Sequence, residues 1–191
     1  MSLYRLPHRL VNKYETRNPF ALAWYLEIPV HKAYHPESNL PGLTSFVASR
    51  ASIFINEAYF EIAQRMDPLY TDEMAEDDMM QVCAHELGHA ILHKKETGTG
   101  MIKEYEIFNV RTRLESEANQ FAAGIRIDQE RMIELFNSGL DLLQVASSLH
   151  VNINLLIYAL GDLRKSGFQL PFIPKSNFLG HIHGVGSSEW N

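Results

Sequence analysis

A short run of residues near the middle of the chain has the spacing of a metal site. His85-Glu86-Leu87-Gly88-His89 matches the pattern HExxH. On a helix, the two histidines lie about 40° apart in azimuth and about 6 Å apart along the axis. Both imidazoles can therefore reach one ion at the roughly 2.0–2.1 Å that zinc requires.

Glu86 stands beside this predicted metal position and is not expected to bind the ion. Its azimuth differs by about 100° from that of His85 and by about 60° from that of His89. A carboxylate placed there can take a proton from a metal-activated water. We therefore predict Zn²⁺ as the cofactor, His85 and His89 as ligands, and Glu86 as the catalytic residue.

The residues around the motif favour a catalytic zinc over a structural one. Apolar side chains border the histidines, so these lie at the edge of a core: Met79, Val82, Cys83, Ala90 and Ile91. A structural zinc usually takes four ligands rich in cysteine. The chain has a single cysteine, and Cys83 lies about 160° from His85 on the helical wheel. Gly88 inside the helix costs about 1 kcal/mol relative to alanine, which indicates a close approach at that point.

The third ligand is predicted from a second helix over residues 113–125. An apolar stripe runs along it through Leu114, Ala118, Phe121 and Ile125. Glu117 falls within this stripe, where a carboxylate needs a metal or an ionic partner. We therefore predict Glu117 as the third ligand and Glu115 as a solvated acid. An ion pair between Glu117 and Arg113 is the alternative.

The elements that must position these residues predict an α+β fold, in which a small sheet packs on the HExxH helix. Strands are expected at 28–33, 45–49 and 52–56. The central helix is expected at 77–93, and residues 96–112 form a loop or a short strand around 105–110. Other helices are expected at 20–26, 58–66, 129–136 and 140–149, with a last one capped by Asn152 and ending before 167.

These elements divide the chain into four predicted parts. Residues 1–17 are a lead-in, 18–127 a core, 128–167 a helical C-terminal module and 168–191 a loosely ordered tail. The formal charge of −6, from 17 basic and 23 acidic residues, argues against a general nucleic-acid binder. One cysteine excludes an intramolecular disulfide. Without a signal peptide or an apolar span, we expect a cytoplasmic protein with no membrane partner.

The two ligand segments resemble the ImmA/IrrE family of zinc metallopeptidases. The similarity lies in HELGHAILH at 85–93 and EANQFA at 117–122. It extends to NPFALAWYLEIPV at 18–30, SIFIN at 52–56 and QVASSLHVNINLLIYAL at 144–160, which is similar to a helix-turn-helix-like segment of the family. Departures are the sequence AAGIRID at 122–128 and a long stretch between 58 and 79.

The resemblance implies an intracellular endopeptidase that cleaves a helix-turn-helix transcriptional repressor and so relieves repression, in a phage or mobile-element setting. It implies zinc bound by His85, His89 and Glu117, with Glu86 as the catalytic acid. A non-catalytic, zinc-containing regulator that sequesters a repressor is the main alternative. DNA binding by residues 140–165 is a third, disfavoured because the second helix of that segment starts without Arg or Lys.

Other residues leave alternatives open. His93 continues the four-residue spacing but stands about 12 Å along the axis from His85, which favours a supporting or packing role over metal binding. His181 and His183 resemble a loose metal pair, although a flexible tail explains them more simply. Tyr105, Arg113 and His93 are all candidates for stabilising a tetrahedral oxyanion.

Overall fold

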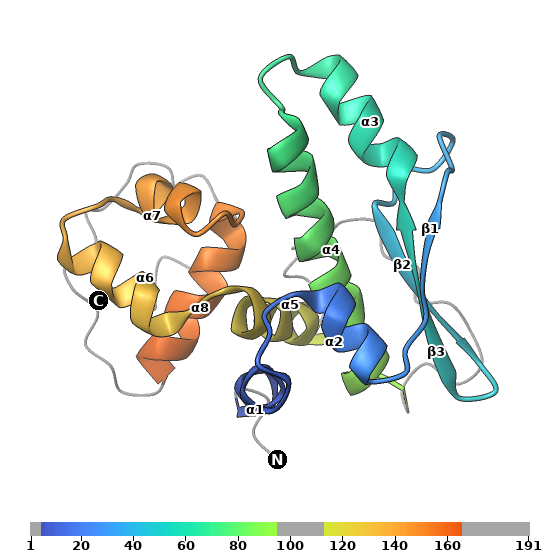
Figure 1. Ribbon diagram of the computed structural model, residues 1–191, viewed down its shortest axis with the longest axis horizontal. Helices are drawn as coiled ribbons and strands as arrows, with labels where there is room; N and C mark the ends of the chain where they lie inside the picture. The colour runs from blue at the N-terminus through green and yellow to red at the C-terminus, as the bar shows by residue number, and fades with distance from the viewer. Residues whose placement is uncertain (1–4, 95–112, 166–191) are drawn as a thin grey trace.

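The computed structural model describes residues 5–94 and 113–165, and within them the fold is α+β. The helices are α1 (Arg5–Tyr14), α2 (Pro19–Tyr25), α3 (Glu57–Met66), α4 (Asp72–Leu92), α5 (Arg113–Arg126), α6 (Gln129–Asn137), α7 (Leu142–Ser148) and α8 (Ile153–Lys165). The strands are β1 (Val30–Ala33), β2 (Gly42–Val47) and β3 (Arg50–Asn56). In Figure 1, α4 lies between the sheet on one side and the C-terminal helices on the other.

The sheet has the order β1-β3-β2, with β3 parallel to β1 and antiparallel to β2. β1 begins directly after Pro29 and forms one edge, as expected for a strand next to a residue that cannot donate a ladder hydrogen bond. β2 and β3 are joined through Ala48 and Ser49, whose φ angles are 46° and 62°. Positive φ at both residues is typical of the two-residue hairpin turns that match strand twist. The turn therefore lies two residues earlier than the sequence predicts.

Local capping explains where several helices begin. Asn18 Oδ1 accepts the main-chain N–H groups of Phe20 and Ala21, ahead of Pro19 at the first helical position. Thr71 Oγ1 caps α4, so this helix starts earlier than predicted and includes the acidic run after residue 72. Acids there interact favourably with the helix dipole. Asp128 and Asp141 cap α6 and α7 in the same way.

The crossing of α4 and α5 is close because one residue at the contact has no side chain. A Cβ added to Gly88 would stand 3.1 Å from Ala118 Cα and 3.2 Å from the Ala118 carbonyl oxygen. The close approach that Gly88 predicts is therefore to the backbone of α5. This approach brings the polar residues at the start of α5 onto the histidine face of α4.

We expect Gly88→Ala to destabilise the protein and Gly161→Ala to stabilise it. Overpacking against a backbone costs about 1–3 kcal/mol, more than the roughly 1 kcal/mol gained in helix propensity. Among the described residues, no atom beyond the nearby backbone of α8 itself lies within 4 Å of a Cβ added to Gly161, so there only the propensity gain of about 0.5–1 kcal/mol is expected. Urea unfolding with a chelator present compares the free energies of unfolding. An equal rise in the free energy of unfolding of both variants would contradict the close crossing of α4 and α5.

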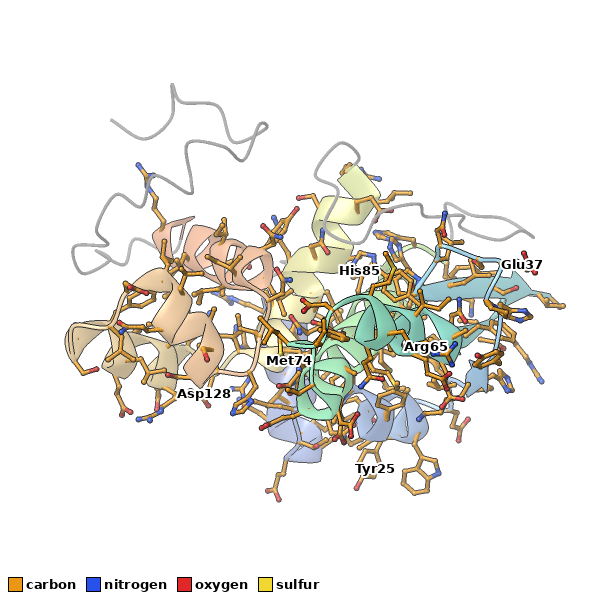
Figure 2. The ribbon with its side chains drawn as sticks, turned by 90° about the horizontal axis from the view of Figure 1, so that it is seen from above. Tyr25, Glu37, Arg65, Met74, His85 and Asp128 are labelled. Carbon is orange, nitrogen blue, oxygen red and sulfur yellow. The ribbon has the colours of Figure 1, made fainter. Side chains whose placement is uncertain are left out.

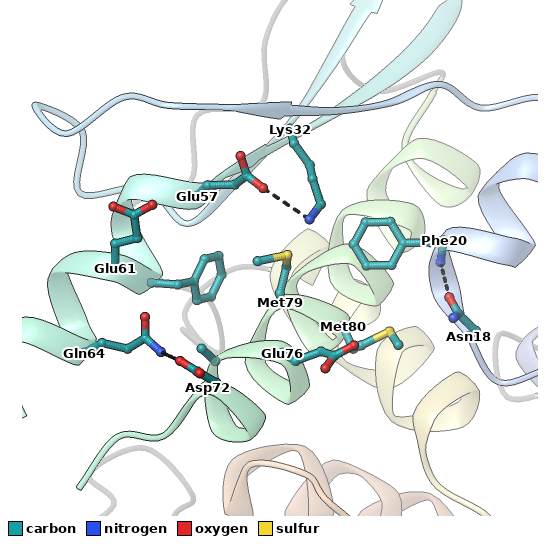
Figure 3. Close-up of a pocket in the computed structure, with 12 residues that line it drawn as sticks. Asn18, Phe20, Lys32, Glu57, Glu61, Gln64, Asp72, Glu76, Met79 and Met80 are labelled. Carbon is teal, nitrogen blue, oxygen red and sulfur yellow. Dashed lines mark hydrogen bonds and ion pairs between the residues drawn. The ribbon is translucent and has the colours of Figure 1, made fainter. Parts of the chain in front are cut away.

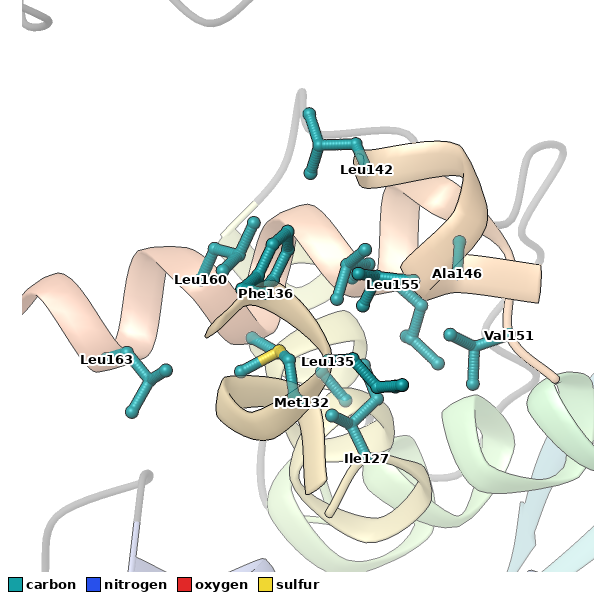
Figure 4. Close-up of a cluster of buried hydrophobic side chains, with 14 of the residues drawn as sticks. Ile127, Met132, Leu135, Phe136, Leu142, Ala146, Val151, Leu155, Leu160 and Leu163 are labelled. Atoms are coloured by element: carbon teal, nitrogen blue, oxygen red, sulfur yellow. The ribbon is translucent and has the colours of Figure 1, made fainter. Parts of the chain in front are cut away.

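Two hydrophobic cores flank the α4–α5 pair. The sheet-side core contains Leu22, Ile53, Ile55, Val82, Leu87, Phe121 and Ile125 among its buried residues. The C-terminal core, shown in Figure 4, joins α6, α7 and α8 to the same pair through residues that include Ala84, Ala122, Met132, Leu155 and Leu156. Because each helix of the pair contributes to both cores, packing restrains it from two sides.

Polar contacts tie the flanking parts to this central pair. Arg17 donates to the carbonyl oxygens of Ile125 and Ile127 at the end of α5 and pairs with Asp128 at 3.1 Å. The buried Gln81 side chain of α4 accepts the main-chain N–H of Asn152 at 2.6 Å. The C-terminal helices are therefore fixed to α4 just before α8 begins.

The expected α+β class, with a small sheet packed on the HExxH helix, is confirmed. The helix-turn-helix-like nature of the C-terminal module and the four-part division of the chain stay predictions. The possible strand at 105–110 and the tail at 168–191 lie outside the described residues. Within those residues, no single helix is both long and apolar enough to cross a membrane; α7 and α8 together, as a pair bent by 103°, meet that criterion by length and composition.

Candidate metal centre

The candidate metal centre is a buried cluster of His85, His89 and Glu115. The two Nε2 atoms lie 3.1 Å apart. Glu115 Oε2 is 3.4 Å from His85 Nε2, and Glu115 Oε1 is 3.8 Å from His89 Nε2. All three residues are buried, and each can offer one ligand atom to a common ion. His85 lies between the sheet and the C-terminal helices (Figure 2).

The geometry and the donor types of this cluster fit zinc. Ligand atoms at about 2.0–2.1 Å from a tetrahedral ion stand roughly 3.3–3.4 Å from one another. The observed separations of 3.1, 3.4 and 3.8 Å bracket that value. Two imidazoles and one carboxylate are also the donor set of catalytic zinc sites that keep a fourth position open. The described residues therefore fit a three-ligand site.

Glu115, and not Glu117, is the carboxylate that the structure brings to the two histidines. The expectation that Glu115 is solvated is wrong, because its exposed fraction is 7%. Glu117 lies to one side of the cluster. Its Oε2 is 3.1 Å from His93 Nε2, and its Oε1 is 3.4 Å from Arg113 Nη1. The ion pair with Arg113 that was the alternative for Glu117 is thus present.

The sequence pattern misplaced the buried face of α5. The buried residues of this helix are Glu115, Ala118, Asn119, Phe121, Ala122, Ala123 and Ile125. They span an arc of roughly 200°, and Glu115 lies near its centre while Glu117 lies outside it. The predicted stripe followed the large apolar residues, which mark only one edge of the arc. Alanine and asparagine add little to an apolar stripe, although here Ala118 lies against Gly88 and Asn119 against His85 of α4.

Glu86 is held by the neighbouring strand. Thr44 Oγ1, in β2, lies 2.7 Å from Glu86 Oε2 and 2.9 Å from the Glu86 carbonyl oxygen. Both residues are buried, and the hydroxyl proton can serve one of these acceptors at a time. A Cβ on Gly42 would come within 3.1 Å of Glu86 Oε1. β2 therefore passes close to the carboxylate and orients it, a contact that no sequence motif indicates.

Each histidine of the cluster has a further partner at its other ring nitrogen. His85 Nδ1 lies 2.8 Å from Asn119 Oδ1, and the Asn119 amide nitrogen donates to the Tyr158 hydroxyl at 3.3 Å. His89 Nδ1 lies 2.7 Å from His93 Nδ1. Partners of this kind orient metal-binding imidazoles and select their tautomer. Through Tyr158, this support reaches α8 in the C-terminal module.

Burial keeps the imidazole of His89 neutral at ordinary pH. Burial, with His85 and His93 adding to it, lowers the pKa of His89 to about 2 in the metal-free chain, against a smaller opposing effect of Glu115. A neutral imidazole is the form that binds a metal. Burial also raises the pKa of the Tyr158 hydroxyl, which therefore remains a neutral hydrogen-bonding group beside Asn119.

A cavity of about 600 Å³ lies away from this cluster, against the N-terminal half of α4. Figure 3 shows Phe20, Met79 and Met80 lining it, with the Lys32–Glu57 ion pair of 3.2 Å at its side. Of the described residues that line it, none belongs to the histidine–glutamate cluster. The cavity therefore contributes no side chain to the candidate centre.

The HExxH motif predicted that His85 and His89 share one helix face, and the structure brings their Nε2 atoms to 3.1 Å. Their role as metal ligands and the catalytic role of Glu86 stay predictions. Glu115, Thr44 and Asn119 were missed. On a helical wheel of α5, Glu115 lies near the middle of the arc that the large apolar and the small residues form together. That position is the sequence signal that could have identified it. Thr44 and Asn119 carry no pattern of their own, because their contacts join segments 42 and 34 residues apart along the chain.

Comparison with known proteins shows what the segment that contains this centre is similar to. Residues 69–160 match the family model described as the IrrE N-terminal-like domain of M78 peptidases. The chain is also 32% identical over 114 residues to "Uncharacterized immunity region protein 2" of Bacillus phage phi105, over 60% of this chain and 61% of that protein. No solved structure matches the chain significantly. The matched segment contains the whole histidine–glutamate cluster, and the sequence resemblance to this family is confirmed over residues 69–160.

Proposed function

We propose that this protein is a zinc-dependent endopeptidase of the cytoplasm that cleaves a helix-turn-helix transcriptional repressor. The observation that carries the proposal is the convergence of His85 Nε2, His89 Nε2 and a Glu115 carboxylate oxygen within ligand distance of one another. The peptidase family model and the phage relative named for an immunity region support the substrate class. A repressor is then a protein substrate, with no direct contact to nucleic acid required.

In this proposal His85, His89 and Glu115 hold the zinc, and Glu86 moves the proton. Zinc bound there supplies a Lewis acid that activates water and polarises a peptide carbonyl. The Glu86 carboxylate accepts a proton from the attacking water and returns it to the leaving amine. Thr44 keeps that carboxylate oriented through its contact with Oε2. The water oxygen thus joins the carbonyl carbon, and the proton that Glu86 carries joins the departing nitrogen.

The candidates for stabilising the oxyanion become fewer. His93 has one ring nitrogen 2.7 Å from His89 and the other 3.1 Å from Glu117, so it is already engaged on both sides. Arg113 is paired with Glu117 but its side chain is 68% exposed, which allows it to turn towards a bound substrate. Tyr105 lies outside the described residues.

Cleavage of a candidate repressor tests the proposal directly. We expect the purified protein with about one zinc per chain to cut the repressor encoded next to its gene at a defined bond, identified by mass spectrometry. A chelator should stop cleavage while most of the far-UV circular dichroism remains, because the two cores support the fold without the metal. An intact repressor after incubation with the zinc-loaded protein contradicts this function and leaves the sequestering regulator.

A further inference from the structure

His89 is the start of a chain of buried contacts that ends at the surface. Its Nδ1 lies 2.7 Å from His93 Nδ1. The other nitrogen of His93, Nε2, lies 3.1 Å from Glu117 Oε2, and Glu117 Oε1 lies 3.4 Å from Arg113. The side chains of His89, His93 and Glu117 are 0%, 1% and 16% exposed, whereas that of Arg113 is 68% exposed.

The positions of the protons along this chain follow from the hydrogen-bonding chemistry of its members. An ionised Glu117 only accepts, so His93 carries its proton on Nε2. The Nδ1 of a neutral His93 is then an acceptor. With His93 neutral, the proton between the two Nδ1 atoms therefore belongs to His89. The Nε2 of His89 then carries the lone pair, and this is the atom that faces His85 and Glu115.

The same outcome is reached at His85 by a different route. Its Nδ1 faces Asn119 Oδ1, which only accepts, so the Nε2 of His85 also keeps its lone pair. Here the partner is a neutral amide. At His89 the chain ends in a carboxylate, which holds the proton on Nδ1 more firmly and makes Nε2 a stronger donor to a metal. The two histidines are therefore prepared by groups of different charge.

We propose that His93 and Glu117 are positioning residues for the metal ligand His89. They fix its tautomer and its ring orientation, and Arg113 holds Glu117 from the solvent side. This role explains why a third histidine follows the HExxH motif at the same four-residue spacing, and why Glu117 is largely buried although the structure places Glu115 at the cluster. The inference rests on the proposed metal centre, but it does not require that the protein be a peptidase.

The test measures zinc affinity of the full chain by competition with a fluorescent chelator. We expect His93→Leu and Glu117→Leu each to weaken zinc binding by about 10–100-fold, the range typical of lost outer partners of a ligand. His93→Gln should recover much of the loss, because its amide oxygen can accept from His89 while its amide nitrogen donates to Glu117. Glu134→Gln, an exposed acid on α6 paired with Arg131, is the matched control and should not change the affinity.

A second measurement separates this role from ordinary packing. Long-range ¹H–¹⁵N NMR of histidine-labelled, metal-free protein reports which nitrogen of His89 carries the proton. We expect the proton on Nδ1 in the unsubstituted chain and a mixture of tautomers in His93→Leu. The proposal would be overturned if the zinc affinities of His93→Leu and the control agreed within twofold. It would also be overturned if the proton of His89 lay on Nε2. If the unsubstituted protein does not cleave the repressor, the proposed peptidase function is wrong. The zinc affinities and the His89 tautomer still test the positioning role, because neither measurement needs a substrate.

Discussion

Glu86→Gln is expected to abolish repressor cleavage while leaving zinc bound. The substitution keeps the side-chain volume and an oxygen that accepts from Thr44 Oγ1, which lies 2.7 Å from Glu86 Oε2. It removes the basic carboxylate, and the loss of a general base slows such reactions by about 10²–10⁴-fold. Cleavage rates and the zinc content of the purified variant, measured on the same preparation, check both parts of the expectation.

Glu76→Gln is the matched control, because Glu76 is an exposed acid on the same helix. It should cleave at the rate of the unsubstituted protein. In cells, Glu86→Gln should also fail to relieve repression. If derepression survives in a variant that no longer cuts, the protein acts by sequestering its partner and the peptidase proposal is wrong. A variant that loses its zinc would instead show that Glu86 supports the metal directly.

Glu115→Gln is expected to weaken zinc binding by more than about 100-fold, beyond the range for a partner that does not touch the metal. The change removes the negative charge from the carboxylate that lies 3.4 Å from His85 Nε2 and 3.8 Å from His89 Nε2. Chelator competition gives the zinc dissociation constant. The metal-free variant should be at least as stable as the unsubstituted chain, because a buried carboxylate has been replaced by a neutral amide.

Glu117→Gln is the comparison that decides between the two carboxylates. Position 117 lies two residues from Glu115 on α5, and the glutamine keeps an oxygen that can accept from His93. The zinc affinity of this variant should therefore fall by no more than about tenfold. The thermal midpoints of both metal-free variants show whether a change in affinity reflects the fold. A larger loss of zinc in Glu117→Gln than in Glu115→Gln would restore the ligand set predicted from sequence.

Much of this protein follows from local patterns in its sequence. The HExxH spacing determines that His85 and His89 share a helix face, because the α-helical repeat brings residues four apart together. Asn18, Asp128 and Asp141 mark helix starts because their side chains cap free N–H groups, whatever the rest of the fold does. The alternation of β-branched and aromatic residues around Ile53 and Ile55 predicts a strand. These signals lie within a few residues of the structure they specify.

The third carboxylate and the groups that orient the site were decided only by the tertiary structure. Glu115 and Glu117 are both acids on the first two turns of α5, and their local sequences do not show which one meets α4. The choice depends on the direction from which α4 approaches, and that direction is set by the close contact of Gly88 with Ala118. Thr44 reaches Glu86 only because β2 packs on α4. Such contacts depend on how whole elements pack, since a helix repeat relates residues within one element and carries no information about the rotation of its neighbour.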